Sequence, residues 1–154
     1  MRSRLRVIEN CQKRVRLSVP RLEQFLLRIS SELDLAPNAT FVRLVTDTEM
    51  RRLNGKFRNK PKTTDVLSFP SETRSLPRSL RSRAMQLRDS YLGDIAISPT
   101  VAERNAKSFG RTLSEEICIL MVHGVLHLLG YDHETDRGEM ERVEAKLRER
   151  LGLS

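Results

Sequence analysis

The three histidines of the chain are its first candidates for chemistry, because all of them lie in the segment 123–133, at His123, His127 and His133. His123 and His127 are four residues apart, so on a helix both project from one face about one turn apart. Gly130 follows where such a helix can end, since the residue after a last turn often adopts a left-handed conformation. The chain can then reverse and bring His133 to the same point.

This spacing is typical of a metal site with three imidazole ligands. Three protein ligands on a tetrahedral ion leave a fourth position for water, as in catalytic rather than structural zinc sites. Zinc is the usual ion for three imidazoles, although nickel, copper and iron also accept them. A single histidine on an apolar helix is more often an ordinary core residue, but three at this spacing favour a ligand set. We therefore expect one Zn²⁺ per chain, held by His123, His127 and His133.

An ion with an open position indicates hydrolysis, because it lowers the pKa of bound water from about 15.7 towards about 7. In H-E-x-x-H metallopeptidases the residue after the first histidine is the glutamate base, and here it is Gly124. A metallopeptidase would need another base, and Asp132 is one possible substitute. Glycine at this position is expected to leave room beside the metal, where a cation could assist phosphodiester hydrolysis.

The charge of the chain is compatible with a polyanionic partner. The net charge is +8, and the basic residues concentrate in segments 1–30 and 51–88, whereas the remaining segments are acidic in sum. Such a pattern indicates nucleic acid or, almost equally well, a solvated surface. Aromatic residues are only 5% of the chain and tryptophan is absent. An extensive base-stacking platform is therefore not expected, and phosphate contacts should dominate RNA binding.

The 154 residues have the length of one domain, 1–154. Strands are expected at 5–8, 41–45, 66–69 (ended by Pro70) and 91–97, with an exposed basic loop over 71–90. Helices are expected to begin at Ser18, Thr46, Ser98, Thr112 and about Asp136; Thr46 and Thr112 are each followed three residues later by glutamate, as in a capping box. This order predicts an α+β fold, a small mixed β-sheet packed against helices, with the metal-binding helix in the core.

We expect the protein to be cytoplasmic and not to associate with a membrane. The longest uncharged apolar stretch, 117–129, is too short to span a bilayer. Glu9 and Asn10 stand where a signal peptide would need apolar residues. Two cysteines, Cys11 and Cys118, are too few for a disulfide framework and suit a reducing compartment.

From about residue 40 to its end, the chain resembles the YbeY family, the bacterial endoribonuclease and rRNA maturation factor. The matching residues are His123-Gly124-x-Leu126-His127-Leu128-x-Gly130-Tyr131-Asp132-His133, Leu53-Asn54 with Phe57-Arg58 and Lys60, Thr64-Asp65-Val66-Leu67-Ser68-Phe69-Pro70, Leu92-Gly93-Asp94-Ile95 and Met140-Glu141. The histidine motif and the segment 64–70 are highly specific, whereas the first 35 residues match only in general character.

The resemblance implies a metal-dependent, single-strand-specific endoribonuclease that acts in 16S rRNA 3′-end maturation and ribosome quality control. It implies zinc on His123, His127 and His133, and a functional arginine at Arg58, so that Arg58 and His127 carry catalysis. Without the resemblance, Arg58 would be interpreted as a surface residue in a salt bridge. The implied partners are single-stranded rRNA, the pre-ribosomal small subunit and its proteins.

Three aspartates are candidates for structural or supporting roles. Asp65 and Asp94 are expected to orient backbone or neighbouring side chains, and Asp132 could instead support a histidine ligand. Two other functions stay open: a non-catalytic ribosome assembly factor with a structural metal, and a metallopeptidase-like hydrolase. The oligomeric state is not predicted.

Overall fold

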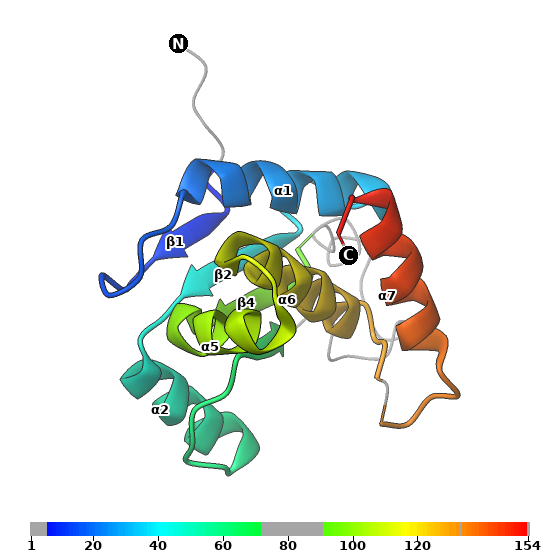
Figure 1. Ribbon diagram of the computed structural model, residues 1–154. Helices are drawn as coiled ribbons and strands as arrows, with labels where there is room; N and C mark the ends of the chain where they lie inside the picture. Colours follow the sequence, from blue (N-terminus) through cyan, green and yellow to red (C-terminus); the bar gives the residue numbers. More distant parts are fainter. Residues whose placement is uncertain (1–5, 72–90, 133, 154) are drawn as a thin grey trace.

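The computed structural model describes residues 6–71, 91–132 and 134–153. These residues form a single α+β domain with a four-stranded sheet of order β1-β2-β4-β3 (Figure 1). The strands are β1 (Ile8–Asn10), β2 (Thr40–Leu44), β3 (Val66–Pro70) and β4 (Gly93–Ile97). β1, β2 and β4 are parallel, whereas β3 is antiparallel to β4. The sheet is therefore small and mixed, as predicted.

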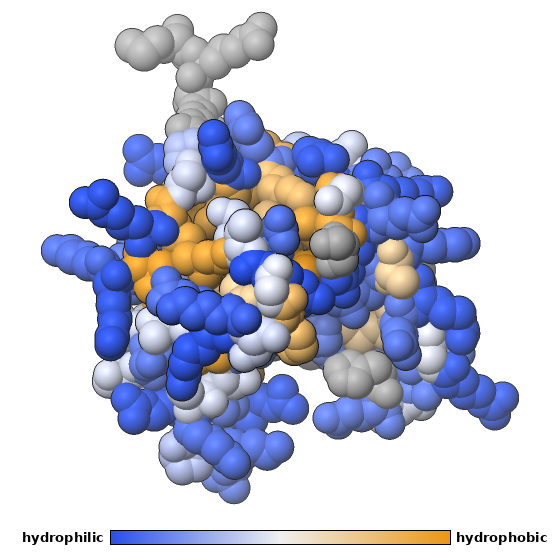
Figure 2. Space-filling model, viewed as in Figure 1, coloured by the Kyte–Doolittle hydropathy of each residue, from blue (hydrophilic) through white to orange (hydrophobic). Residues whose placement is uncertain are grey.

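The helices of the described residues are α1 (Val19–Glu32), α2 (Asp47–Arg58), α5 (Pro99–Phe109), α6 (Leu113–Leu128) and α7 (Glu139–Arg150). α6 contacts α1, α5, α7, β3 and β4, and Figure 1 shows it at the centre of the molecule. Hydrophilic side chains cover most of the face in Figure 2, and hydrophobic ones gather between α1 and α5. The helix that carries His123 and His127 thus lies in the core.

The sheet separates two apolar clusters, because successive side chains of a strand point to opposite faces. In β4, Ile95 and Ile97 belong to the larger cluster, which also contains the buried residues of α6. Ala96 belongs to the smaller cluster, which consists of Val45, Met50, Leu67 and Ala96 with Leu53 and Phe69 against them. α2 covers this second face and thereby brings its own side chains beside β3.

The local signals for helix ends are confirmed. The side chain of Thr46 accepts a hydrogen bond from the backbone N–H of Glu49 (3.1 Å), and that of Thr112 accepts one from Glu115 (3.2 Å). These bonds satisfy donors that the first turn of a helix leaves free. Gly110 ends α5 with φ +66°.

β1 and α7 begin later than the sequence indicates. β1 occupies Ile8–Asn10, and of the predicted strand 5–8, Leu5 lies outside the described residues while Arg6 and Val7 precede β1. Ile8 pairs with Val42, and the N–H groups of Val7 and Ile8 donate to the carboxylate of Glu23. α7 begins at Glu139 and not at Asp136. The carboxylate of Asp136 instead accepts hydrogen bonds from the N–H groups of Gly138 and Met140, both 2.9 Å, and so precedes the helix as a local cap.

Further strand boundaries differ, and β2 spans Thr40–Leu44 and not 41–45. Pro70 is the last residue of β3 and does not stand outside it, which the edge position of β3 permits, since a ring nitrogen without hydrogen is tolerated at a sheet edge. β4 begins at Gly93 and not at Tyr91. The predicted loop, apart from its first residue, and His133 lie outside the described residues. Within the part of the chain that is described, no helix has the length and apolar character needed to cross a membrane.

Candidate functional site

His123 and His127 point their Nε2 atoms at each other from successive turns of α6. The two nitrogens are 3.0 Å apart, and the ring centroids are 4.5 Å apart with 78° between the ring planes. Two nitrogens on one tetrahedral zinc, each bonded at about 2.0–2.1 Å, lie about 3.3 Å apart. The pair therefore has nearly the separation that a shared ion requires, as the spacing of the two histidines predicts.

The third predicted ligand, His133, lies outside the described residues. Among the residues that are described, no group of three or more histidine, cysteine or acidic side chains is arranged to hold a metal. The segment before His133 does turn back as expected: Gly130 has φ +99°, and the N–H groups of Gly130 and Tyr131 donate to the carbonyls of His127 and Leu126. This is the hydrogen-bonding pattern of a helix end closed by glycine.

A carboxylate from α7 stands behind the first histidine. The Nδ1 atom of His123 is 3.7 Å from Oε1 of Glu144, and the His123 side chain is 27% exposed. Histidines that bind a metal through one ring nitrogen commonly present the other to a carboxylate, which fixes the tautomer and the ring orientation. Glu144 is thus positioned to support His123. Asp132 accepts a hydrogen bond from the N–H of Glu134 (3.0 Å), and its suggested support of a histidine stays a prediction.

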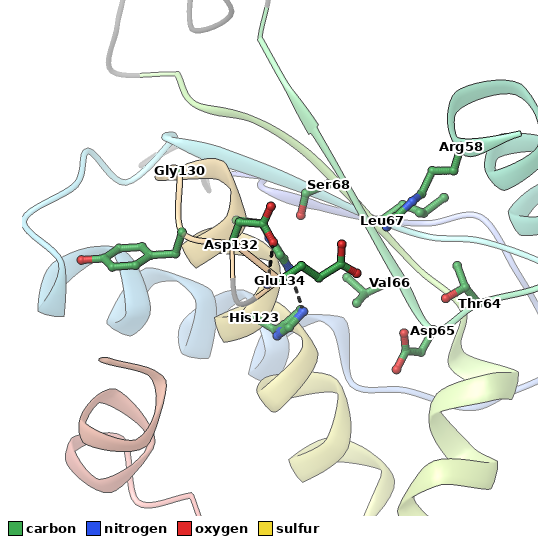
Figure 3. Close-up of a pocket in the computed structure, with 12 residues that line it drawn as sticks. Arg58, Thr64, Asp65, Val66, Leu67, Ser68, His123, Gly130, Asp132 and Glu134 are labelled. Carbon is green, nitrogen blue, oxygen red and sulfur yellow. Dashed lines mark hydrogen bonds between the residues drawn. The ribbon is translucent and has the colours of Figure 1, made fainter. Parts of the chain in front are cut away.

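The histidines open into a cavity of about 430 Å³ between α6, β3 and the end of α2. It is lined by Arg58, Thr64, Asp65, Val66, Leu67, Ser68, His123, His127, Gly130, Tyr131, Asp132 and Glu134. Figure 3 shows Arg58 approaching β3 from one side and His123 lying on the other, with Asp132 and Glu134 beside the histidine. The cavity therefore combines imidazoles, one guanidinium and three carboxylates.

The end of α2 holds Arg58 at this cavity. Asn59 ends the helix in a left-handed conformation (φ +57°), and the N–H of Lys60 donates to the carbonyl of Asn54. The buried side chain of Asn54 then donates to the carbonyl of Lys62 (2.8 Å). These bonds fix the turn that follows Arg58. Asn54 and Lys60, which belong to the same motif of the resemblance as Arg58, therefore help to position the end of the helix that carries it.

Gly124 does not leave room beside the histidines, and that expectation is wrong. Gly124 is buried, its carbonyl accepts a hydrogen bond from Ser68 Oγ (3.0 Å), and it faces β4. A Cβ atom at this position would lie 2.9 Å from two side-chain carbons of Ile95. The space next to Gly124 is thus filled by the side chain of Ile95 in β4.

Asp65 and Asp94 have the structural contacts that the sequence suggested. Asp65 accepts hydrogen bonds at its side chain from Asn105 (3.3 Å) and at its carbonyl from the N–H of Ser98 (3.0 Å). Asp94 accepts a hydrogen bond from the hydroxyl of Tyr91. Asp65 additionally lines the cavity, so it connects β3 and α5 to the site.

Comparisons with known proteins place the chain in a family. The family model described as Endoribonuclease YbeY matches residues 7–152. The endoribonuclease YbeY of Solibacter usitatus is 47% identical over 135 residues, which are 87% of this chain and 80% of the relative. That of Koribacter versatilis is 48% identical over 111 residues, 71% and 63% of the two chains. A solution structure from Thermotoga maritima is 28% identical with a TM-score of 0.60, covering 96% of this chain and 89% of the other. The chain belongs to the YbeY endoribonuclease family, which acts in rRNA maturation.

Proposed function

We propose that this chain is a zinc-dependent endoribonuclease specific for single-stranded RNA, with one Zn²⁺ held by His123, His127 and His133. The observation that carries the proposal is the 3.0 Å separation of the Nε2 atoms of His123 and His127 at a cavity that Arg58 also lines. Membership of the YbeY family supports the reaction class, and the donor set of imidazoles suits zinc.

When bound, the ion supplies a Lewis acid and a water of lowered pKa. The histidines would bind the ion through Nε2, and the carboxylate of Glu144 next to Nδ1 of His123 would orient that ring and favour the tautomer that keeps its proton on Nδ1. Arg58 would donate two parallel hydrogen bonds to phosphoryl oxygens, since its guanidinium is planar and always charged. Of the carboxylates in the cavity, Asp132 and Glu134 are the candidates for a general base.

The proposed substrate is the 3′ end of 16S rRNA on the pre-ribosomal small subunit, within rRNA maturation and ribosome quality control in the cytoplasm. The family supports this setting, and the basic residues around Arg58 suit a phosphate backbone. Cys11 and Cys118 are both free thiols, as is usual in a reducing compartment.

The decisive experiment measures metal content and ribonuclease activity on one preparation, the wild type beside His127→Ala. The wild type should contain about one zinc per chain and cut single-stranded RNA but not duplex RNA, whereas His127→Ala should lose both metal and activity. A folded wild type that cannot be loaded with zinc would contradict the metal site. A zinc-loaded wild type that binds RNA without cutting it would instead favour the non-catalytic assembly factor.

A further inference from the structure

Two phenylalanines meet at the surface beside the candidate site. The rings of Phe57, in α2, and Phe69, in β3, lie 4.9 Å apart between centroids with 68° between their planes. Phe57 is 57% exposed, an unusual state for a large apolar side chain. Phe69 is half-buried against the smaller apolar cluster. The pair thus forms an open corner of two nearly perpendicular aromatic rings.

This corner adjoins the cavity of the histidines. A hollow of about 420 Å³ is lined by Phe57, Arg58, Leu67, Ser68, Phe69 and Pro70. Three of these residues, Arg58, Leu67 and Ser68, also line the cavity that contains His123 and His127. The two hollows therefore meet at Arg58 and the middle of β3. The volume is sufficient for a small planar group.

The position of Phe57 is only partly explained by packing. Met50, Leu53 and Phe57 lie on one face of α2, where Met50 is fully buried and Leu53 packs against the smaller cluster. Phe57 continues this row beyond the core, and cations flank it: the Nζ atom of Lys56 is 5.5 Å from its ring centroid, and Arg58 follows in sequence. Aromatic rings beside basic side chains are the combination that binds single-stranded nucleic acid.

We propose that Phe57 and Phe69 form a nucleobase-binding subsite for the RNA substrate. The base next to the phosphate at Arg58 would stack on Phe57, with its edge against Phe69. This inference rests on the proposed function and adds a reason for single-strand specificity, because a base in a duplex is already stacked and cannot enter the corner. The scarcity of aromatic residues in the sequence is compatible with one such subsite, although not with an extensive platform.

The test compares Phe57→Leu with Phe109→Leu. Leucine keeps an apolar side chain but removes the aromatic face, and Phe109 is a matched control because it is likewise exposed (65%) and lies at the end of α5, outside both hollows. Binding of single-stranded oligoribonucleotides that contain 2-aminopurine is followed by fluorescence, and gels confirm that the RNA is still intact. Melting temperatures establish that each variant is folded.

Phe57→Leu should weaken binding by about 5-fold to 150-fold, as expected for the loss of one stacked base, and should lose the fluorescence quenching that stacking produces. Phe57→Tyr should restore both, whereas Phe109→Leu should bind like the wild type. An abasic nucleotide scanned along the oligonucleotide should weaken wild-type binding at one position and leave Phe57→Leu unaffected there. This loss of additivity would identify the stacked base.

The outcomes separate this proposal from the enzymatic one. If folded Phe57→Leu binds RNA and quenches fluorescence like Phe109→Leu, the proposed nucleobase-binding subsite is wrong. Phe57 and Phe69 then only cover the smaller cluster or contact a protein partner, and the proposed nuclease function is not affected. If the wild type shows quenching that depends on Phe57 but never cuts RNA, the subsite stands and the proposed nuclease function fails.

Discussion

Arg58 connects the two hollows, and its side chain is exposed at the end of α2. It belongs to neither apolar cluster of the described residues, so its loss should affect chemistry more than folding. Removing one preorganised donor to a developing anion costs on the order of 3 kcal/mol, or roughly a hundredfold in rate. We expect Arg58→Ala to cut single-stranded RNA about a hundredfold more slowly while its melting temperature stays within a few degrees.

Arg58→Lys is the matched variant for this prediction. It keeps the charge but loses the two parallel hydrogen bonds, so it should restore only part of the rate. The measurement is kcat on an RNA oligonucleotide, with zinc content determined on the same samples. Cleavage by Arg58→Ala at the wild-type rate would show that the guanidinium has no catalytic role.

Glu144 lies next to His123 of the proposed zinc site and should affect zinc binding through that histidine. Carboxylates in this position typically change metal affinity by about 10-fold to 100-fold. We therefore expect Glu144→Ala to weaken zinc binding by about that factor, measured by competition with a chelator of known affinity. Glu149→Ala is the control, because Glu149 lies on the same helix but is exposed near its end. Equal zinc affinities for the two variants would contradict the supporting role.

At the scale of residues, the spacing of the histidines was sufficient to predict the convergence of His123 and His127, because a helix fixes the geometry of side chains four residues apart. It was not sufficient for Glu144. That carboxylate comes from another helix, and its place depends on how α7 packs on α6. The contact of Gly124 with Ile95 was not predictable for the same reason, because the sequence pattern does not indicate which face of the helix meets β4.

At the scale of elements, helix caps offer a test with an internal control. Thr112 begins α6 and its side chain accepts a hydrogen bond from Glu115, whereas Ser18 begins α1 and its side chain makes no capping bond. Thr112→Ala should lower the free energy of unfolding by about 1 kcal/mol, and Ser18→Ala should change it far less. Denaturant unfolding of both variants measures the difference. Equal losses would show that the capping bond of Thr112 contributes nothing.

The two helical glycines should respond oppositely to alanine. Alanine favours a helix over glycine by about 1 kcal/mol. At Gly55 the added Cβ would have an ordinary contact of 3.5 Å with Pro61, so Gly55→Ala should raise stability by up to that amount. At Gly124 the added Cβ would lie 2.9 Å from two side-chain carbons of Ile95, which is fully buried in the larger cluster.

Overpacking of this kind typically costs about 1–3 kcal/mol and outweighs the gain in propensity, so Gly124→Ala should be destabilising by up to about 2 kcal/mol. Thermal unfolding of Gly55→Ala, Gly124→Ala and the wild type measures these stability changes. If Gly124→Ala is as stable as Gly55→Ala, α6 does not pack against β4 as closely as described.

The order of elements was predictable because capping boxes, prolines and apolar periodicity are local signals. Boundaries that depend on long-range contacts were not. β1 is placed by its pairing with β2 and by the carboxylate of Glu23, which is distant in sequence. The start of α7 is displaced because Asp136 caps the helix from outside it, and a residue of this type is common both at a cap and in a first turn.

At the scale of the whole molecule, the candidate site occupies one edge of the sheet. β3 is the edge strand at the site, and β1 forms the opposite edge, against which α1 packs. Lys56, Lys60 and Lys62 are exposed around the end of α2, next to β3, whereas Arg16 and Arg21 are exposed beside β1 and at the start of α1. Basic residues thus occur at both edges, and the net charge of +8 alone does not indicate which edge binds RNA.

Salt dependence can distinguish the two edges, because each phosphate that is neutralised releases counterions and contributes about −0.7 to the slope of log affinity against log salt for a single strand. Replacing Lys56, Lys60 and Lys62 together with glutamine should make the slope less steep by as much as about 2, since three contacts are removed at the site edge. Replacing Arg16 and Arg21 with glutamine should leave the slope close to that of the wild type, although the net charge also falls. Affinities for one single-stranded oligonucleotide, measured at several salt concentrations, give both slopes. If the slope decreases more in the arginine variant than in the lysine variant, the RNA binds along the β1 edge and not along the edge that carries Arg58.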